Sequence, residues 1–355
     1  MKRETKLSKK YPLFCRKQPF TKRNNKNRQK RRTKMIKKKR EKSHKLMTHE
    51  AGMRRVPKNH PKYPILEQEY GKLSYGHKGE EALDYFLTFL PNDNYLILNS
   101  LRLEDPKGRY FQIDSLLLAP THCIILDSKF MSGKLEFDES ANQLLRHLPG
   151  SADVEKLGDP ISQISRQRHQ LSLWLEKNGF PPMPIASLIV LTHNNAALIK
   201  TTPSITRKVT FHTNLPNRLK EIDENIPKRN ILLSNKDLYK LSRTLIKKHT
   251  PDHFQLLNHY NVAFNELITG VICVKCSYAP MLRGRGVWGC LRCSAYSKDA
   301  HIEAIRDYKL LIGETISNKE LRSYLKLPSA SITSKYLVSM GLKFEGSFKN
   351  RRYFL

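Results

Sequence analysis

The sequence predicts a mixed α/β domain followed by a small cysteine module and a helical tail. Three observations lead to this prediction. Stretches with helical spacing of apolar residues alternate with short apolar runs of strand length over residues 60–260. Four cysteines lie close together over residues 271–297, and three helix-like stretches with a two-stranded ribbon follow over residues 298–355. A chain of 355 residues has room for two or three such units.

The elements of the middle segment follow one another in a clear order. Apolar residues at helical spacing predict an amphipathic helix over residues 79–90. "YLILNSLRL", "YFQIDSLLL" and "CIILDSKF" have the composition of strands, and a hairpin follows them. Asp159-Pro160 is typical of a helix start, and this helix is expected to end at Asn178-Gly179. A buried strand, a short strand near residue 230 and a last helix complete one mixed α/β core.

The charge of the chain is strongly positive and unevenly distributed. The formal net charge is +32, and residues 1–59 hold 24 Lys and Arg against three Glu. Few large apolar residues lie in this segment, so we expect it to be a disordered basic arm. A surplus of this size predicts a partner rich in phosphate, and we expect nucleic acid. Both Met1 and Met35 remain open as the true start.

Other features exclude several classes of protein. No apolar run approaches the roughly 20 residues of a membrane span, so we expect no membrane contact. The basic N-terminus lacks the apolar stretch of a secretory signal. Six cysteines, four of them clustered, do not fit a secreted disulfide scaffold. The chain is expected in a reducing cytoplasm.

Charged residues interrupt two strands that otherwise read as core. Asp127 and Lys129 share one face of their strand because side chains alternate. A four-residue loop over 119–122 would pair Leu118 with Cys123, and Asp114 would then lie opposite Asp127. Two facing carboxylates repel unless a cation lies between them.

Two interpretations of these charges remain open. Paired carboxylates with a lysine are the groups needed for metal-assisted hydrolysis of a phosphodiester, with Mg²⁺ or Mn²⁺ on Asp114 and Asp127. Alternatively, Lys129 neutralises one of the aspartates in a structural ion pair.

Four motifs in this order resemble the nuclease-related domain family: "GHKGEEALDYFL", "FQIDSLLL", "CIILDSKF" and "DPISQISRQ". The resemblance spans roughly residues 70–250 and implies a restriction-endonuclease-like core. It implies catalytic roles for Glu80, Asp114, Asp127 and Lys129, and a role for Gln163. The family usually has Glu at the position of Asp127, which is one methylene shorter.

Each of these helix residues has a second interpretation. A carboxylate such as Glu80 is favoured near a helix N-terminus whatever its function. Gln163 and Gln167 lie four residues apart, hence on one helix face. They are candidates for contacts to phosphate or base, although solvated glutamines on helices are common.

The cysteine module has the spacing of a structural zinc site. "CVKC" and "CLRC" place Cys273, Cys276, Cys290 and Cys293 as two C-x₂-C pairs, and four thiolates close a tetrahedron. The module resembles a zinc ribbon of the topoisomerase or primase type. Arg283 and Arg285 lie between the pairs with Trp288, a mixture suited to nucleic acid. The alternative is a ribbon that only docks against its neighbours.

The tail has the rhythm of a helix-turn-helix with a wing. Helices are expected over residues 302–312, 317–326 and 329–339, and Ser329 is expected to cap the last of them. Lys335 on that helix and Arg351 on the following ribbon are candidates for phosphate contacts. Winged helices also bind proteins, so both partners remain open.

Together these features predict a bacterial, cytoplasmic, DNA-processing protein with a metal-dependent nuclease core. DNA is favoured over RNA. The competing hypothesis is a non-catalytic nucleic-acid-binding protein that retains a nuclease-like fold. Endonuclease or exonuclease action, sequence preference and oligomeric state are left open.

Overall fold

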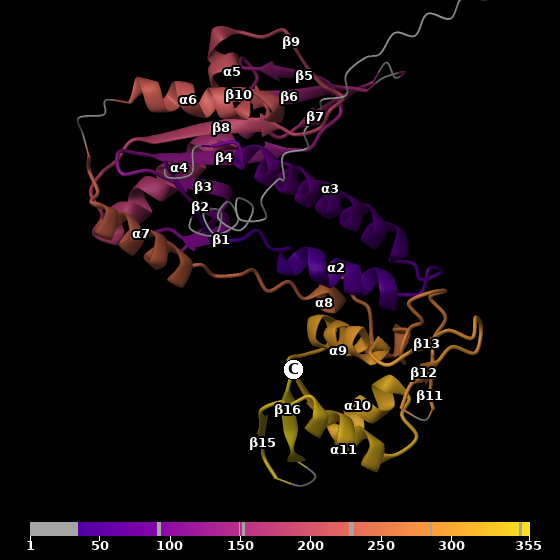
Figure 1. Ribbon diagram of the computed structural model, residues 1–355. Helices are drawn as coiled ribbons and strands as arrows, with labels where there is room; N and C mark the ends of the chain where they lie inside the picture. Colours follow the sequence, from indigo (N-terminus) through magenta and orange to yellow (C-terminus); the bar gives the residue numbers. More distant parts are fainter. Residues whose placement is uncertain are drawn as a thin grey trace, which may run out of the picture.

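The computed structural model describes residues 35–90, 94–148, 150, 153–226, 231–284, 286–347 and 350–355. Its centre is a mixed sheet with strand order β1-β2-β3-β4-β8-β10 (Figure 1). The strands are β1 (Ile36–Lys38), β2 (Leu96–Glu104), β3 (Tyr110–Leu118), β4 (Cys123–Lys129), β8 (Ile185–Leu191) and β10 (Val209–Phe211). The pairs β2-β3 and β3-β4 are antiparallel, whereas β1-β2, β4-β8 and β8-β10 are parallel.

Helices cover both faces of this sheet, as expected for strands that are apolar on both sides. The helices are α3 (Tyr63–Leu87), α4 (Pro160–Lys177), α5 (Pro203–Lys208), α6 (Leu215–Asn225) and α7 (Asn235–Lys247), with a short 3₁₀ turn η1 (His212–Asn214). Apolar residues of α4 and α7 pack on one face, and those of α3 and α6 pack on the other. The prediction of a mixed α/β core is confirmed.

Local signals account for the helix ends. Asp159 accepts hydrogen bonds from the backbone N–H groups of Ile161 and Ser162, as the expected cap of α4. Helix α3 begins well before the expected residue 79, because Pro64 starts it and Leu66 anchors its first half in a separate apolar cluster. The strand expected near residue 230 is not formed over the described residues 231–234. There the backbone N–H groups of Leu232 and Leu233 both bond to the carbonyl of Pro120.

A second, four-stranded sheet of order β7-β6-β5-β9 extends the domain. Its strands are β5 (Gly133–Asp138), β6 (Gln143–His147), β7 (Val154–Leu157) and β9 (Ala196–Ile199). Leu135, Phe137 and Leu144 join the core on the α4 face of the main sheet. The hairpin expected after β4 is therefore confirmed, and it continues the same hydrophobic core.

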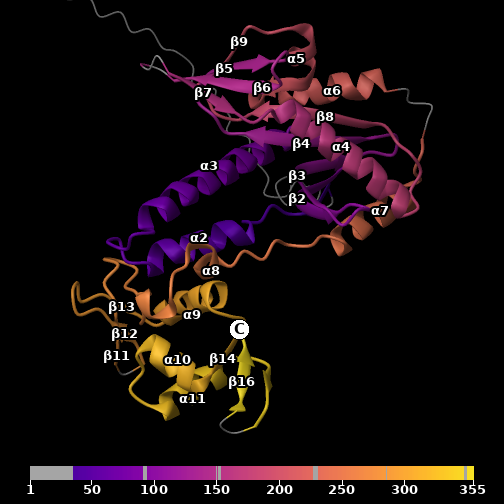
Figure 2. The same cartoon turned by 180° about the vertical axis from the view of Figure 1, so that it is seen from behind.

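The cysteine module and the tail share one core of their own. The elements after residue 248 are α8 (Leu256–Tyr260), η2 (Phe264–Glu266), β11 (Leu282–Arg283), β12 (Trp288–Gly289), β13 (Tyr296–Ser297), α9 (Ala300–Leu311), β14 (Thr315–Ser317), α10 (Asn318–Leu325), α11 (Ala330–Ser339), β15 (Phe344–Glu345) and β16 (Arg352–Phe354). Trp288 of the cysteine module is buried with Tyr308 and Leu337 of the tail. The cysteine module and the tail together form one compact C-terminal module, visible below the sheet in Figures 1 and 2.

The tail contains three helices and a two-stranded ribbon at the expected places in the sequence. Ser329 caps α11 through its hydroxyl, as expected, and Ser317 caps α10 in the same way. Strand β14 was not foreseen, and it pairs with β16 to give the sheet order β14-β16-β15. The element order is therefore helix, strand, two helices and a ribbon.

The basic N-terminal segment requires a correction. We expected disorder through residue 59, yet Ile36–Lys38 forms strand β1 and His44–Arg55 forms helix α2. Residues 1–34 lie outside the described part of the chain. Composition predicted disorder here because residues 35–59 contain few large apolar side chains. A few buried residues, such as Ala51 and Val56, and the ion pairs of Arg40 and Arg55 stabilise this part of the chain. No helix among the described residues is long and apolar enough to cross a membrane.

Helix α2 joins the middle domain to the C-terminal module through buried charges. Asp307 of α9 is fully buried, and its carboxylate accepts from Arg55 Nε at 2.7 Å and from Arg54 Nη2 at 2.6 Å. Arg55 is only 1% exposed and also donates to the carbonyl oxygen of Gly270. Buried charges are tolerated only when they are paired and hydrogen-bonded in this way.

We predict that Asp307→Ala destabilises the protein by about 3–5 kcal/mol, because it leaves two guanidinium groups without their carboxylate. Chemical denaturation of the variant and the parent measures the difference. Glu303→Ala is the matched control. Glu303 lies on α9 like Asp307, and its carboxylate is 3.7 Å from Arg54 Nε, but its side chain is 49% exposed. Equal stability of the Asp307 variant and the control would contradict the structural role of this ion pair.

Candidate functional site

Six of the residues singled out from the sequence line one cavity of about 440 Å³. The cavity lies between α3, β3, β4 and α4, beside the sheet. Its walls include Glu80, Asp114, Asp127, Lys129, Gln163 and Gln167. The fold therefore brings together side chains that are separated by up to about half of the middle domain in sequence.

The strand register agrees with the predicted one. Leu118 pairs with Cys123, and the ladder continues to Ser115 opposite Leu126. It ends there, one position before Asp114 and Asp127 would face each other. Beyond the ladder, the Asp114 carboxylate accepts hydrogen bonds from the backbone N–H and the hydroxyl of Ser128, at 2.8 and 3.1 Å.

Asp127 and Lys129 form an ion pair inside the cavity. Lys129 Nζ lies 2.6 Å from Asp127 Oδ2, and Asp127 is 2% exposed. Lys129 also donates to Gln163 Oε1 at 3.2 Å, so the ammonium is shared between β4 and α4. The ion pair that we considered as the alternative is thus present. It lies on a central strand, and in a cavity with two further carboxylates.

Glu80 is held by a residue that the sequence did not point to. Arg40, in the loop between β1 and α2, donates to Glu80 Oε2 at 2.9 Å and to the backbone oxygen of Asp114 at 3.0 Å. The same guanidinium bonds both carboxylate oxygens of Asp84 and the hydroxyl of Ser115. The Arg40 side chain is only 3% exposed. No local motif marks it, because it is one of many basic residues in its segment.

Burial raises the pKa of two of these carboxyl groups. Desolvation raises the pKa of Glu80 to about 7, with a further rise from Asp114, while Arg40 opposes the shift. Desolvation also raises the pKa of Asp127 to about 6, against the lowering effect of Lys129 and again with a rise from Asp114. The protein cations therefore compensate only part of the cost of burying these carboxylates. An added cation would favour their ionised forms.

The two glutamines of α4 are held by the protein rather than free in solvent. Gln163 accepts from Lys129, and Gln167 Nε2 donates to the backbone oxygen of Gln112 at 2.9 Å. Gln167 is 7% exposed, and its Oε1 finds no hydrogen-bond partner within the described residues. Gln167 lines the cavity, but this oxygen atom is itself buried.

The four cysteines converge as the spacing predicts. Their sulfur atoms all lie within 4.8 Å of one another. Cys273 Sγ is 3.7 Å from Cys293 Sγ, and Cys276 Sγ is 3.5 Å from Cys290 Sγ. Four sulfurs around a zinc ion at about 2.3 Å would be separated by about 3.8 Å in a tetrahedron. The donor set and its spacing fit a closed zinc site. Cys123 is separate from this cluster and buried in the core.

Two of the four predicted nucleic-acid contacts of the C-terminal module, Arg283 and Arg351, lie over aromatic rings of the protein itself. The Arg283 guanidinium lies over the rings of Trp288 and Tyr336, at 5.6 and 5.2 Å from their centroids. We expected Trp288 to be available for stacking on a base, but its side chain is fully buried, so this expectation is wrong. Arg351 lies over Phe344 at 4.3 Å, whereas Lys335 on α11 is exposed. Arg285 lies outside the described residues.

The fold and the cavity together describe a mixed α/β domain with a cluster of carboxylates and one lysine, and a separate four-cysteine cluster lies in the C-terminal module. Residues 75–192 match the family described as Nuclease-related domain. The matched segment includes the second half of α3, strands β3 and β4 and the whole of α4, hence all six cavity residues named above. Neither the curated proteins nor the solved structures give a match to the chain.

We expect purified protein to contain about one zinc per chain, since four thiolates close one tetrahedral site. Elemental analysis measures the metal, and thiol titration confirms that the cysteines are reduced. Cys276→Ser should lose most of the zinc, whereas the buried Cys123→Ser should keep it. Reduced thiols without zinc in the parent would contradict the assignment.

The raised pKa values of Glu80 and Asp127 predict that their contribution to the stability of the fold decreases as the pH rises. Folded Glu80 and Asp127 bind protons more tightly than the unfolded chain does. Their ionisation therefore destabilises the fold as the pH rises from about 4 through about 7. Asp114→Asn should weaken this dependence, because the charge of Asp114 raises the pKa of both groups. Thermal melts without added divalent cation, at pH 5 and pH 8, should show the variant gaining on the parent at the higher pH. A difference that does not change with pH would contradict the coupling.

Proposed function

We propose that the cavity is the active site of a metal-dependent nuclease that cleaves phosphodiester bonds in DNA. The observation that carries this proposal is the meeting of Asp114, Asp127 and Lys129 in one cavity, with two carboxyl groups whose pKa is raised by burial and by Asp114. Such groups, grouped in a cleft, are typical of functional sites. The match to the nuclease-related domain family supports the same reaction class.

The donor set fits a hard divalent cation. Carboxylate oxygens are the ligands that Mg²⁺ and Mn²⁺ prefer, and Mg²⁺ retains several waters when protein ligands are few. No group of three carboxylates in the described residues has its oxygens as close together as the four cysteine sulfurs. Asp114 and Asp127 would hold the ion, with Glu80 nearby. When bound, the ion would activate water and stabilise charge on the phosphate.

The side chains of the chain itself have distinct roles in this proposal. Lys129, fixed by Asp127 and Gln163, places a positive charge where negative charge develops on the phosphate. Arg40 is a positioning residue, because it fixes Glu80 and the backbone of Asp114 without lining the cavity. Ser128 keeps the Asp114 carboxylate in one orientation.

The C-terminal module would act as the DNA-holding part. Its element order, α9, β14, α10, α11 and the β15-β16 ribbon, supports the proposal that it is a winged helix. Exposed Lys335 lies on α11, the helix that would approach DNA. We also propose that the four-cysteine cluster holds a structural zinc ion, and that the basic residues of the chain bind the backbone by charge.

One observation favours the alternative of a non-catalytic nucleic-acid-binding protein. Asp127 already pairs with Lys129, and Glu80 already pairs with Arg40. A site with its charges matched internally can persist as a structural network. The alternative predicts binding of nucleic acid without cleavage.

Asp114→Asn should abolish cleavage and divalent-cation binding, because it removes a ligand charge while an amide oxygen can still accept from Ser128. Lys129→Gln should lower the turnover by roughly 10²–10³-fold. Cleavage is measured on plasmid, linear and single-stranded DNA with Mg²⁺ and with Mn²⁺. Cation binding is measured by calorimetric titration.

Lys134→Gln is the matched control for the lysine, since Lys134 is exposed on β5 and does not line the cavity. It should cleave like the parent. A parent that binds DNA but neither cleaves it nor binds a divalent cation would overturn the nuclease proposal in favour of the alternative.

A further inference from the structure

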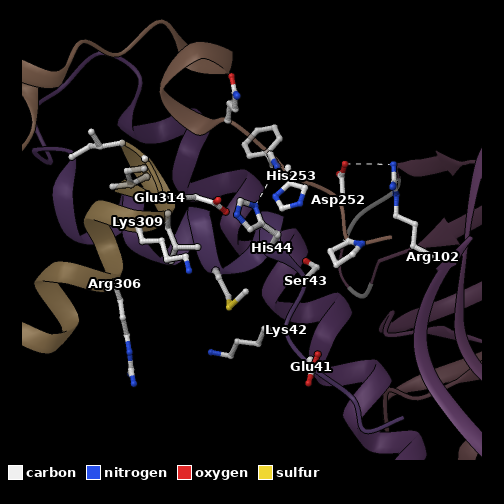
Figure 3. Close-up of a pocket in the computed structure, with 18 of the residues that line it drawn as sticks. Glu41, Lys42, Ser43, His44, Arg102, Asp252, His253, Arg306, Lys309 and Glu314 are labelled. Carbon is white, nitrogen blue, oxygen red and sulfur yellow. Dashed lines mark hydrogen bonds and ion pairs between the residues drawn. The ribbon is translucent and has the colours of Figure 1, made fainter. Parts of the chain in front are cut away.

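A groove of about 1070 Å³ lies between the middle domain and the C-terminal module (Figure 3). One wall is the segment from Lys38 into α2, a second is the connection over residues 249–264, and a third is α9. Helices α2 and α9 lie side by side in both overall views (Figures 1 and 2). We call this cavity the basic groove, after its five cations: Lys38, Lys42, Arg102, Arg306 and Lys309.

Positive charge exceeds negative charge along the groove. Its acidic residues are Glu41, Asp252 and Glu314, and Asp252 lies 3.5 Å from Arg102. Lys42 forms an ion pair with Glu50, which does not line the groove. The Lys42 side chain is nevertheless 46% exposed. Arg306 is exposed and forms no ion pair with another described residue. A phosphate in the groove would thus meet cations that the protein leaves partly unneutralised.

Two of the exposed cations of the groove face the same space. Figure 3 shows Lys42 and Arg306 extending from different walls, one from the segment just before α2 and the other from α9, into the open part of the groove. They belong to the two modules that Asp307 fastens together. Their spacing is therefore set by the fold, and a ligand lying between them would contact both modules.

An aromatic side chain stands at the wall of the groove. Phe264 is 47% exposed and lines the cavity with the polar residues Asn258 and Gln255. Exposed aromatic rings beside cations are the usual means of binding single-stranded nucleic acid, because unpaired bases stack on the ring while phosphates meet the charges.

The groove meets the candidate active site on β2 and β3. Gln112 lines both cavities. Its partner in the strand register is Arg102, whose guanidinium lies 3.9 Å from the ring centroid of Tyr110. Tyr110 in turn lines the active-site cavity and is 44% exposed. The two cavities are thus joined by a stacked Arg–Tyr pair and a shared glutamine.

We propose that the basic groove binds a single strand of DNA and directs it towards the cavity of Glu80, Asp114 and Asp127. The direction of the path rests on the proposed nuclease function, whereas the binding site does not. A single strand is favoured over a duplex because a cavity of about 1070 Å³ holds a few unpaired nucleotides.

Fluorescence anisotropy with a labelled oligothymidylate of about 15 nucleotides, without added divalent cation, tests the site. The double variant Lys42→Glu/Arg306→Glu should bind at least about tenfold more weakly, and its slope of log affinity against log salt should be smaller by about one to two. Lys208→Glu/Lys220→Glu is the control for charge alone, since it changes the net charge by the same amount and both lysines are exposed and outside the groove lining, with Lys220 75% exposed on α6. It should bind within about twofold of the parent.

Folding of each variant is checked by its melting temperature and zinc content. If the charge reversals unfold the protein, Lys42→Gln/Arg306→Gln should give a smaller loss in the same direction. Unchanged binding by a folded groove variant, or an equal loss in the Lys208/Lys220 control, would overturn the proposal. A duplex of the same length should bind less tightly than the single strand, and a duplex that binds as tightly and responds to the same variants would overturn the single-strand assignment.

The same measurements separate this inference from the nuclease proposal. Groove-dependent binding by a parent that does not cleave DNA with Mg²⁺ or Mn²⁺ supports the groove and overturns the proposed function. Metal-dependent cleavage with binding unaffected by Lys42 and Arg306 overturns the groove and leaves the nuclease in place.

Discussion

The arginines of the segment around α2 hold the structure together. At one end Arg40 is buried against Glu80, Asp84 and the backbone of Asp114. At the other end Arg55 is buried against Asp307 and the carbonyl of Gly270. Guanidinium has five donors in a planar fork, so each arginine can satisfy several buried acceptors at once. Arg40 contacts the carboxylates of the candidate site, and Arg55 contacts the C-terminal module, so the two arginines connect both parts to the segment around α2.

This dependence links a basic segment to the chemistry of the candidate site. Burial stabilises the neutral form of Glu80 and Asp127, and Arg40 and Lys129 pull only partly in the opposite direction. In the proposed function, a bound metal ion would compensate these carboxylates as they ionise near neutral pH. A fully compensated ion-pair network would have carboxyl groups with lowered pKa values, as Asp105 has beside Arg109.

Geometry, rather than any single residue, connects binding to catalysis in the proposed scheme. The antiparallel register of β2 and β3 places Arg102 beside Gln112, and thereby joins the groove to the cavity. The cysteine cluster and the tail share one core, so a metal ion at the cysteines would stabilise the module that carries α9. Arg306 on α9 then faces Lys42 because Asp307, its neighbour, is fastened to α2.

The sequence by itself determined the features that depend on local pattern. Strand alternation placed Asp127 and Lys129 on one face, a short loop determined the β3-β4 register, and C-x₂-C spacing brought the thiols together. Only the tertiary structure decided which cations meet which acids. Arg40 and Arg306 resemble every other basic residue in the sequence, and they were missed for that reason. Long-range ion pairs and cavities between modules have no periodic signal, because they arise from packing of segments that lie far apart along the chain.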